Sequence, residues 1–394
     1  MSAFGTLESS ELTPIFQGDF TYGLNTQLWN AVVVSGTAAT IDTNASRLRI
    51  QSGTGSAGYA YITSRKIVRY RAGQGTTARF TPLFSTPQAN SIQLFGVGSI
   101  ASNIPNDGFY FGYNGTALSI AKYTSGTPTW VAQSSWNGDK VDGSAGTSFN
   151  WVPTNGTPAM IKYPYLGYGD IEFFLQNPSD GRWVLVHVIQ YANTATAVEL
   201  SNPSLQFVGF AQNSGNTTNL TMYCGSVGIF ISGPRSFISS PRWASDKQLT
   251  VAVTETLILN LRNATSYNGV TNRGAIRLNN FSMASSVTNQ TAVVKFYMGT
   301  VPGGSPSFTT ISGTTSDNGV TITAGNSVAS VDTAGTKVGT GVNYIFNISY
   351  AGSGVAVDLT PYEIFINPGD VLSITGTASG NMASNFSVNW SEDI

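Results

Sequence analysis

The side chains best suited to ligand binding lie between residues 130 and 168. Aromatic residues there alternate with Gly, Asn, Asp and Pro. Aromatic rings have flat apolar faces that can stack on sugars, and neighbouring amides and carboxylates can hydrogen-bond to sugar hydroxyls. The stretch is therefore a candidate glycan-binding rim, while the alternative is that these rings fill a core or a subunit interface. The candidate set is Trp130, Trp136, Asn137, Asp139, Trp151, Tyr165 and Tyr168.

Paired carboxylates are the second feature that could support chemistry. A glycosidase needs two acids that face one groove. Asp170 and Glu172 are two residues apart, so in a strand their side chains share a face. They also follow a turn, where exposed acids are common, and we treat a polysaccharide-degrading enzyme as an alternative only. Asp139 and Asp142 match no calcium-loop spacing, so no metal site is predicted.

The chain has one histidine, His187, and one cysteine, Cys224. His187 lies in an apolar strand pattern with no Gly-x-Ser-x-Gly motif near it, and one histidine cannot form a multi-histidine zinc site. Cys224 lies in an alternating run with no adjacent cation, which favours a core position, and it has no intrachain disulfide partner. The sequence therefore predicts no catalytic residue and no cofactor, and a protein that is not an enzyme.

Positive charge is concentrated in one place, residues 65–71. In a continuous strand, Arg65, Arg69 and Arg71 would share a face and could contact an acidic neighbour in an assembly; a solvated, ion-paired face is the alternative. Elsewhere charge is scarce, at 10% of residues and a net −1, against roughly 25% in ordinary domains. This balance argues against nucleic-acid binding, and the absence of a long apolar run argues against membrane insertion.

These side chains would be positioned by strands, because Val, Ile, Thr, Tyr and Phe carry the apolar pattern and long helix-forming stretches are absent. Asn114-Gly115 is a strong signal for a β-hairpin, and residues 177–181 predict a second one. The best predicted strands are 46–51, 59–70, 79–84, 91–97, 109–113, 117–122, 171–175, 183–189, 249–261, 275–283, 292–298, 342–350 and 371–375.

Recurring short strands with turns between them predict an all-β protein with two antiparallel β-sandwich domains in tandem, jelly-roll or lectin-like in type. The sequence changes character near residues 232–242, beyond which tryptophan becomes rare. We predict an extended lead-in over 1–18, an aromatic-rich, lectin-like sandwich over 19–235, and a Val/Thr-rich, jelly-roll-like sandwich over 236–394.

Several segments resemble virion structural proteins of tailed phages and large DNA viruses, of the head-fibre, tail-fibre or capsid-decoration type. The resemblance covers most of residues 1–235 and about the last 25 residues. It rests on Phe4-Gly5-Thr6-Leu7, Asp19-Phe20-Thr21-Tyr22-Gly23-Leu24-Asn25 with Trp29, Tyr70-Arg71-Ala72-Gly73-Gln74-Gly75, residues 107–115, Trp136-Asn137-Gly138-Asp139, residues 181–187, Asn367-Pro368-Gly369-Asp370 and residues 388–393.

The resemblance implies a non-enzymatic fibre, spike or minor capsid protein on the particle surface. Its expected partners are other virion proteins and further copies of itself, and a homotrimer is compatible with the resemblance and with the low charge. Host-surface glycans are an additional expected partner. A glycan-binding receptor-recognition module and a polysaccharide-degrading β-sandwich enzyme are the two alternative functions.

Overall fold

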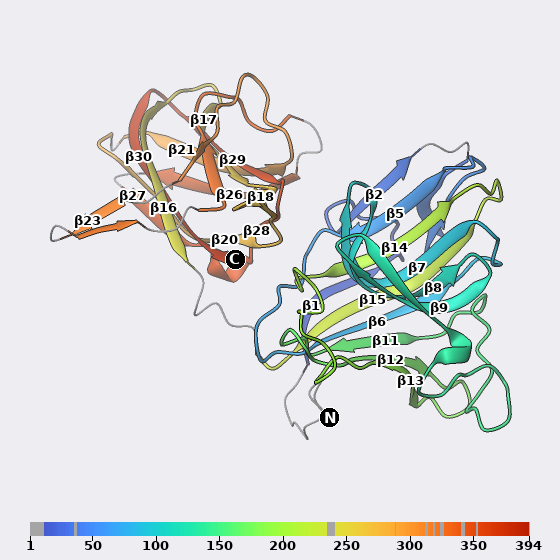
Figure 1. Cartoon of the computed structure of the whole chain (residues 1–394). Coiled ribbons are helices and arrows are strands. Elements are labelled where there is room, and N and C mark those ends of the chain that lie inside the picture. Colours follow the sequence, from blue (N-terminus) through green and yellow to red (C-terminus); the bar gives the residue numbers. More distant parts are fainter. Residues whose placement is uncertain are drawn as a thin grey trace. The chain divides into compact units, whose positions relative to one another are not determined.

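The chain forms two compact units, residues 1–235 and 236–394, in the computed structural model (Figure 1). The division falls where the sequence changes character. Each unit is described by itself. No helix in the described part of the chain is long and apolar enough to cross a membrane. The structure describes residues 12–393 except 35–37, 235–240, 288, 312–313, 318–319, 324–326, 340–342 and 352–353.

The first unit is built from two antiparallel sheets. The eight-stranded sheet has the order β13-β12-β11-β6-β15-β4-β3, and β1 also pairs with β15. Its strands are β1 (Leu12–Asp19), β3 (Thr40–Asn44), β4 (Arg47–Gln51), β6 (Thr76–Leu83), β11 (Ala159–Tyr163), β12 (Ile171–Gln176), β13 (Trp183–Ile189) and β15 (Thr221–Ser232).

The seven-stranded sheet of this unit has the order β10-β9-β8-β7-β14-β5-β2. A short 3-10 helix, η1 (Gln133–Ser135), follows β10. The strands of this sheet are β2 (Trp29–Val34), β5 (Tyr59–Ser64), β7 (Ser91–Ala101), β8 (Ile104–Asn114), β9 (Ala117–Thr124), β10 (Thr127–Ala132) and β14 (Gln206–Asn213).

Aromatic rings fill the space between the two sheets. Phe111 packs edge-on against Phe173 with ring centroids 5.3 Å apart, and Phe95 stacks on Phe207 at 6.1 Å. Trp29 is 1% exposed and contacts the rings of Phe16, Phe20 and Phe207. A ring buries more apolar surface than an aliphatic side chain, so a few rings from each strand close this core.

The seven-stranded sheet also buries apolar side chains on its outer face. Ala121 and six larger side chains form a second buried cluster there, separate from the core between the sheets. The six are Tyr61, Leu94, Tyr110, Tyr123, Val208 and Phe210. The strand register places Tyr61, Phe210 and Leu94 in one row across β5, β14 and β7. Burial raises the pKa of the Tyr123 hydroxyl to about 12. We call these six side chains the outer aromatic cluster.

Glycines make room for the outer aromatic cluster. A Cβ on Gly98 would lie 1.8 Å from the Tyr110 Oη, because the ring of Tyr110 reaches across the neighbouring strand. The space at Gly112 on β8 is similarly small, since an added Cβ there would lie 1.9 Å from the Gln93 carbonyl oxygen. The Tyr110 hydroxyl donates to the Asp107 carbonyl oxygen at 3.2 Å, which fixes the ring in this position.

The second unit contains two larger antiparallel sheets and two two-stranded ones. Of the larger sheets, one has the order β16-β30-β20-β27, with β28 also paired to β20, and the other β22-β25-β17-β29-β21-β26. The elements of this unit are β16 (Arg242–Val251), β17 (Thr256–Asn263), β18 (Ser266–Tyr267), β19 (Val270–Thr271), β20 (Ala275–Ser285), β21 (Thr291–Gly299), β22 (Thr309–Thr310), β23 (Thr314–Asp317), β24 (Val320–Thr323), β25 (Ala329–Asp332), β26 (Asn343–Ala351), β27 (Gly354–Asp358), η2 (Thr360–Tyr362), β28 (Phe365–Ile366), β29 (Val371–Ala378) and β30 (Met382–Asp393).

A buried carboxylate organises part of the second core. Glu392 is fully buried and accepts hydrogen bonds from Ser327 Oγ, the Val328 and Ala329 amides, and Trp390 Nε1. A charge removed from water needs several donors to be tolerated. This network therefore ties the last strand, β30, to the segment that enters β25.

The all-β prediction is confirmed, the described part of the predicted extended lead-in is a paired strand, and two predicted strands have wrong bounds. The lead-in over 1–18 contains strand β1, which pairs with β15; residues 1–11 lie outside the described residues. The predicted strand 59–70 ends at Ser64, where the Ser64 hydroxyl donates to the Lys66 carbonyl oxygen. The predicted strand 249–261 is two strands, because the chain turns after Val251 and begins β17 at Thr256.

Substituting Gly98→Ala should destabilise the first unit by roughly 1–3 kcal/mol, because the added methyl group overlaps Tyr110 and the Asp107 carbonyl. Gly225→Ala is the matched control, since its Cβ would meet Thr81 at an ordinary 3.6 Å. Urea unfolding followed by tyrosine and tryptophan fluorescence measures both. Equal unfolding midpoints for the two variants would contradict the role assigned to Gly98.

Candidate functional site

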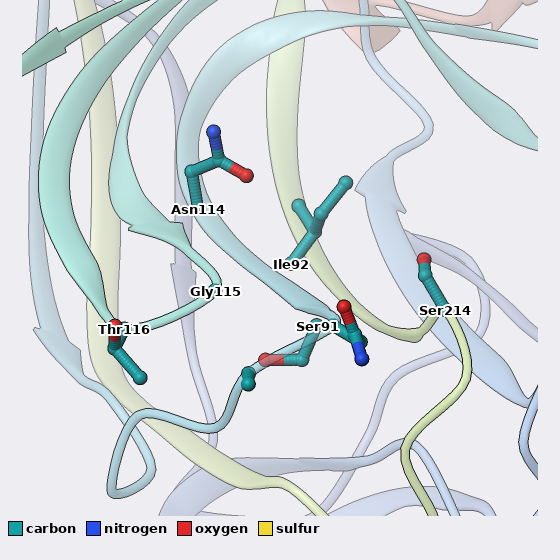
Figure 2. Close-up of a pocket in the computed structure, with 8 residues that line it drawn as sticks. Ser91, Ile92, Asn114, Gly115, Thr116 and Ser214 are labelled. Carbon is teal, nitrogen blue, oxygen red and sulfur yellow. The ribbon is translucent and has the colours of Figure 1, made fainter.

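A pocket of about 420 Å³ opens at one end of the first unit (Figure 2). The hairpin turn between β8 and β9, the segment before β7 and the end of β14 surround it. Its eight lining residues are all uncharged. They are Ala89, Asn90, Ser91, Ile92, Asn114, Gly115, Thr116 and Ser214.

Backbone hydrogen bonds hold the three loops of the pocket together. The Gly115 amide donates to the Ser91 carbonyl oxygen at 2.8 Å, and the Ser214 amide donates to the Asn90 carbonyl oxygen at 2.8 Å. Gly115 and Asn90 have φ values of 60° and 53°, a region that Gly and Asn adopt most readily. The pocket is therefore preformed by turn chemistry.

The pocket continues onto the outer face of the seven-stranded sheet. The register aligns Tyr59, Gln212, Ile92 and Asn114 in one row across β5, β14, β7 and β8. Neighbouring strands are about 4.8 Å apart, so the row is roughly 14 Å long. Tyr59 is half-buried and stacks on Phe210 with ring centroids 6.3 Å apart. We call this row, together with the pocket, the polar strip.

The polar groups of the strip are available to a ligand. Within the described part of the chain, the side chains of Asn90, Asn114, Thr116, Gln212 and Ser214 have no hydrogen-bond partner. Amides and hydroxyls both donate and accept, so the strip offers a mixture of donors and acceptors without net charge. Figure 2 shows Asn114, Ile92 and Ser214 around the pocket. This chemistry suits a neutral ligand that carries several hydroxyl groups.

The structure places three of the predicted rim residues in the core. Trp136, Trp151 and Tyr165 are 2%, 4% and 6% exposed and belong to the cluster between the sheets. Trp136 Nε1 donates to the Val131 carbonyl oxygen, and the Tyr165 hydroxyl donates to the Leu200 carbonyl oxygen. These rings have no face free for a sugar, so their assignment to a glycan-binding rim is corrected to a role in packing.

The other rim residues lie apart from the polar strip. Trp130 is half-buried and packs edge-on against Tyr123 at 6.1 Å, while Tyr168 is exposed. The Asn137 side chain bonds the backbone of Val188 through both its nitrogen and its oxygen. Asp139 accepts hydrogen bonds from the amides of residues 141 and 148. The polar side chains of this group therefore shape loops.

The arginines of 65–71 do not share a strand face. The strand that was expected to align them ends at Ser64, and Val68 forms only an isolated bridge to Leu205. Arg65 Nε donates to the Thr26 and Trp29 carbonyl oxygens. Arg69 and Arg71 are half-buried and also have interaction partners. The continuous strand expected to align Arg65, Arg69 and Arg71 is therefore absent, while their contact with an assembly partner stays a prediction.

The predicted acid pair also separates in role. Asp170 precedes β12 and accepts hydrogen bonds from the Tyr191 and Ala192 amides, which anchors the loop after β13. Glu172 lies within β12 opposite Lys162 of β11.

Glu199 is a buried acid that the sequence pattern does not single out. Its side chain is 1% exposed, and neither carboxyl oxygen has a hydrogen-bond partner among the described residues.

Burial raises the pKa of Glu199 to about 8; nearby Lys122 lowers it in part, and Asp170 raises it further. At neutral pH the carboxyl group is therefore mostly protonated in the folded protein. This removes the cost of an unpaired buried charge.

The histidine and the cysteine have structural positions. His187 is 6% exposed and packs near Phe173, and its Nδ1 accepts a hydrogen bond from the Asn137 amide. Burial lowers the pKa of His187. Cys224 is fully buried, which raises the pKa of its thiol to about 12, so the reactive thiolate is suppressed. No group of three or more potential metal ligands occurs among the described residues.

No family model and no curated protein matches the chain. Solved structures do match. One is an endo-1,3-β-glucanase from Streptomyces sioyaensis, at 11% identity and a TM-score of 0.41, covering 58% of this chain and 99% of that one. Another is lectin UEA-II complexed with galactose, at 13% identity and a TM-score of 0.36, covering 56% and 100%. A legume lectin-like domain from Entamoeba histolytica matches at 10% identity and 0.33, covering 54% and 95%.

These comparisons correct one prediction and leave another untouched. The prediction that the chain is not an enzyme is contradicted, because glucanases are among the matching structures, and we withdraw it. The resemblance to virion structural proteins is not tested and stays a prediction.

Sequence reasoning missed most of the polar strip. Asn114-Gly115 was recognised as a hairpin turn, and the same residues form one side of the pocket. Tyr59 and Gln212 are more than 150 residues apart in sequence and meet only through the pairing of β5 with β14. The alternation of Tyr59 and Tyr61 along β5 is the signal that could have indicated an aromatic outer face.

Glu199 should make stability depend on pH. Its pKa in the folded protein, about 8, exceeds the ordinary value of about 4.3. The unfolded state therefore loses this proton first, and the free energy of unfolding should fall by about 1.4 kcal/mol per pH unit between these two values.

Glu199→Gln should remove this slope, so its stability relative to the native chain should increase steadily from about pH 5 to pH 8. Urea unfolding at pH 5, 6, 7 and 8 provides the measurement. Glu172→Gln, which removes an acid from a half-buried strand position, is the control. Parallel pH curves for the native chain and Glu199→Gln would show that Glu199 is ionised in the folded state.

Proposed function

We propose that the first unit is a carbohydrate-recognition module that binds a neutral saccharide along the polar strip. The observation that carries the proposal is the row Tyr59, Gln212, Ile92 and Asn114, which leads into a pocket lined only by uncharged groups. A ring and an aliphatic side chain provide apolar contact to a sugar face. Two amides in the same row provide donors and acceptors to its hydroxyls.

The size and charge of the strip support a short neutral oligosaccharide. The volume of its pocket, about 420 Å³, falls within the ordinary range of small-molecule sites, roughly 300–1,000 Å³. A phosphate or carboxylate ligand would need a cation, and the pocket lining has none. The lectin-like and glucanase-like fold class is consistent with this proposal, which goes further than the fold by naming the residues.

Asn114→Ala combined with Ser214→Ala should weaken binding of a neutral oligosaccharide by roughly 5- to 150-fold, because each of the two lost hydrogen bonds contributes about 0.5–1.5 kcal/mol. A glycan array that includes β-1,3-glucan and galactose-terminated oligosaccharides selects the probe, and titration calorimetry then measures its Kd. Neither substitution alters a backbone hydrogen bond of the pocket.

Asn155→Ala is the matched control, because Asn155 is an exposed loop amide outside the pocket. It should leave the Kd unchanged. Failure of every neutral oligosaccharide on the array to bind the native chain, or the same Kd for the native chain and the double variant, would refute the proposal.

Display on the surface of a virus particle remains a proposal that rests on the sequence resemblance alone. A neutral glycan site on such a protein would serve attachment to a host surface. Mass spectrometry of purified particles tests this location, and absence of the chain from particles would contradict it.

A further inference from the structure

A second cavity, of about 440 Å³, lies on the eight-stranded sheet of the first unit. It shares no residue with the polar strip. Residues from β1, β6, β13 and β15, with Pro158 before β11, form it. Its lining residues are Gln17, Gly18, Asp19, Arg79, Phe80, Thr81, Pro158, Trp183, Ser226, Val227, Gly228 and Phe230. We call it the cross-strand groove.

The groove contains an arginine that the protein itself does not neutralise. Arg79 is exposed, and its guanidinium lies over the ring of Phe230 at 5.5 Å from the centroid. Among the described residues Arg79 forms no ion pair or hydrogen bond. Stacking on a ring orients the planar guanidinium while its N–H donors stay available for a carboxylate.

Glycine allows this arrangement. A Cβ on Gly228 would lie 2.9 Å from the Phe230 ring, so the ring lies over the backbone of its own strand. Gly228 also pairs directly with Arg79 across β15 and β6. The absence of a side chain at this position leaves the space in which Phe230 and Arg79 meet.

Apolar and hydroxyl-bearing groups accompany the cation. Trp183 is half-buried and begins β13, and Pro158 lies at the start of the neighbouring segment. Thr81 and Ser226 contribute hydroxyls, which can donate and accept. The groove thus combines an indole, a guanidinium and hydroxyls, whereas the polar strip is uncharged.

The groove crosses the strands instead of following one of them. The sheet order from β1 through β15, β6, β11 and β12 to β13 comprises five strand spacings, or about 24 Å at roughly 4.8 Å each. Asp19 lies at the β1 end, two spacings from the strand of Arg79, and its Oδ1 accepts a hydrogen bond from the Thr21 amide. The strands that carry Asp19 and Arg79 are thus about 10 Å apart.

We propose that the cross-strand groove is a second saccharide site, specific for a chain that carries carboxylated sugars. The ligand carboxylate pairs with Arg79 through charge-assisted hydrogen bonds. An adjacent sugar ring packs on Trp183, and Thr81 and Ser226 bond its hydroxyls. An extended acidic oligosaccharide of several units matches the length of the groove.

Affinity for pentagalacturonate, measured by titration calorimetry on the full chain, tests this site. The native chain should bind it, and the methyl-esterified pentamer, which lacks the charges but keeps the sugars, should bind much more weakly. Arg79→Gln should weaken binding of the acidic pentamer by roughly 10- to 100-fold, because a charge-assisted hydrogen bond is lost. Trp183→Ala should weaken the binding of both the acidic and the methyl-esterified pentamer.

Arg182→Gln is the matched control, because Arg182 is an exposed arginine next to Trp183 that is absent from the groove lining. It removes the same charge and should leave the Kd unchanged. The double variant Asn114→Ala with Ser214→Ala should also bind the acidic pentamer normally, so this site and the neutral-glycan proposal fail independently. Melting curves establish that each variant is folded.

Four results would overturn the proposal. One is equal affinity of the native chain and Arg79→Gln. Another is an equal loss in Arg79→Gln and Arg182→Gln, which would indicate a diffuse electrostatic effect. The third is no binding of pentagalacturonate by the native chain at millimolar concentration. Binding of an acidic peptide in place of the saccharide, with the same dependence on Arg79, would also refute the ligand class.

Discussion

The burial of side chains on both faces of the seven-stranded sheet is the constraint on which the first unit depends. One face closes the core between the sheets, and the other carries the outer aromatic cluster. Large rings on both faces of closely spaced strands crowd each other. Gly98 and Gly112 relieve this crowding by leaving space beside Tyr110 and the Gln93 carbonyl. Phe210 of the outer aromatic cluster in turn stacks on Tyr59 of the polar strip.

The two saccharide sites proposed here use opposite sheets and different chemistry. The polar strip offers amides, hydroxyls and a tyrosine ring without charge. The cross-strand groove offers a guanidinium held on a phenylalanine ring beside an indole. In both sites the backbone takes its shape from a glycine or from an asparagine in the left-handed conformation, and rigid strands supply the side chains. Such preorganisation limits the conformational entropy lost when a ligand binds.

Strand type and chain division could be predicted from the sequence, because alternation and turn residues are local signals. The strand 183–189 and the turn at Asn114-Gly115 show this. The functional residues could not be predicted in the same way. Trp136 and Trp151 lie in a stretch whose composition is typical of a binding rim, yet both side chains are buried in the core. A sequence pattern does not show which side chains of a loop point toward the sheets. Tyr59 and Gln212 become neighbours only through long-range pairing.

The turn at Asn114 also affects the chemical lifetime of the protein. An asparagine followed by glycine is prone to deamidation, because the unhindered glycine nitrogen can attack the side-chain carbonyl carbon and expel ammonia. Water then opens the resulting succinimide to aspartate or isoaspartate. Here that nitrogen donates its hydrogen to the Ser91 carbonyl oxygen at 2.8 Å. The hydrogen bond that shapes the pocket therefore also restrains the reacting atom. It protects an uncharged surface from acquiring a negative charge as the protein ages.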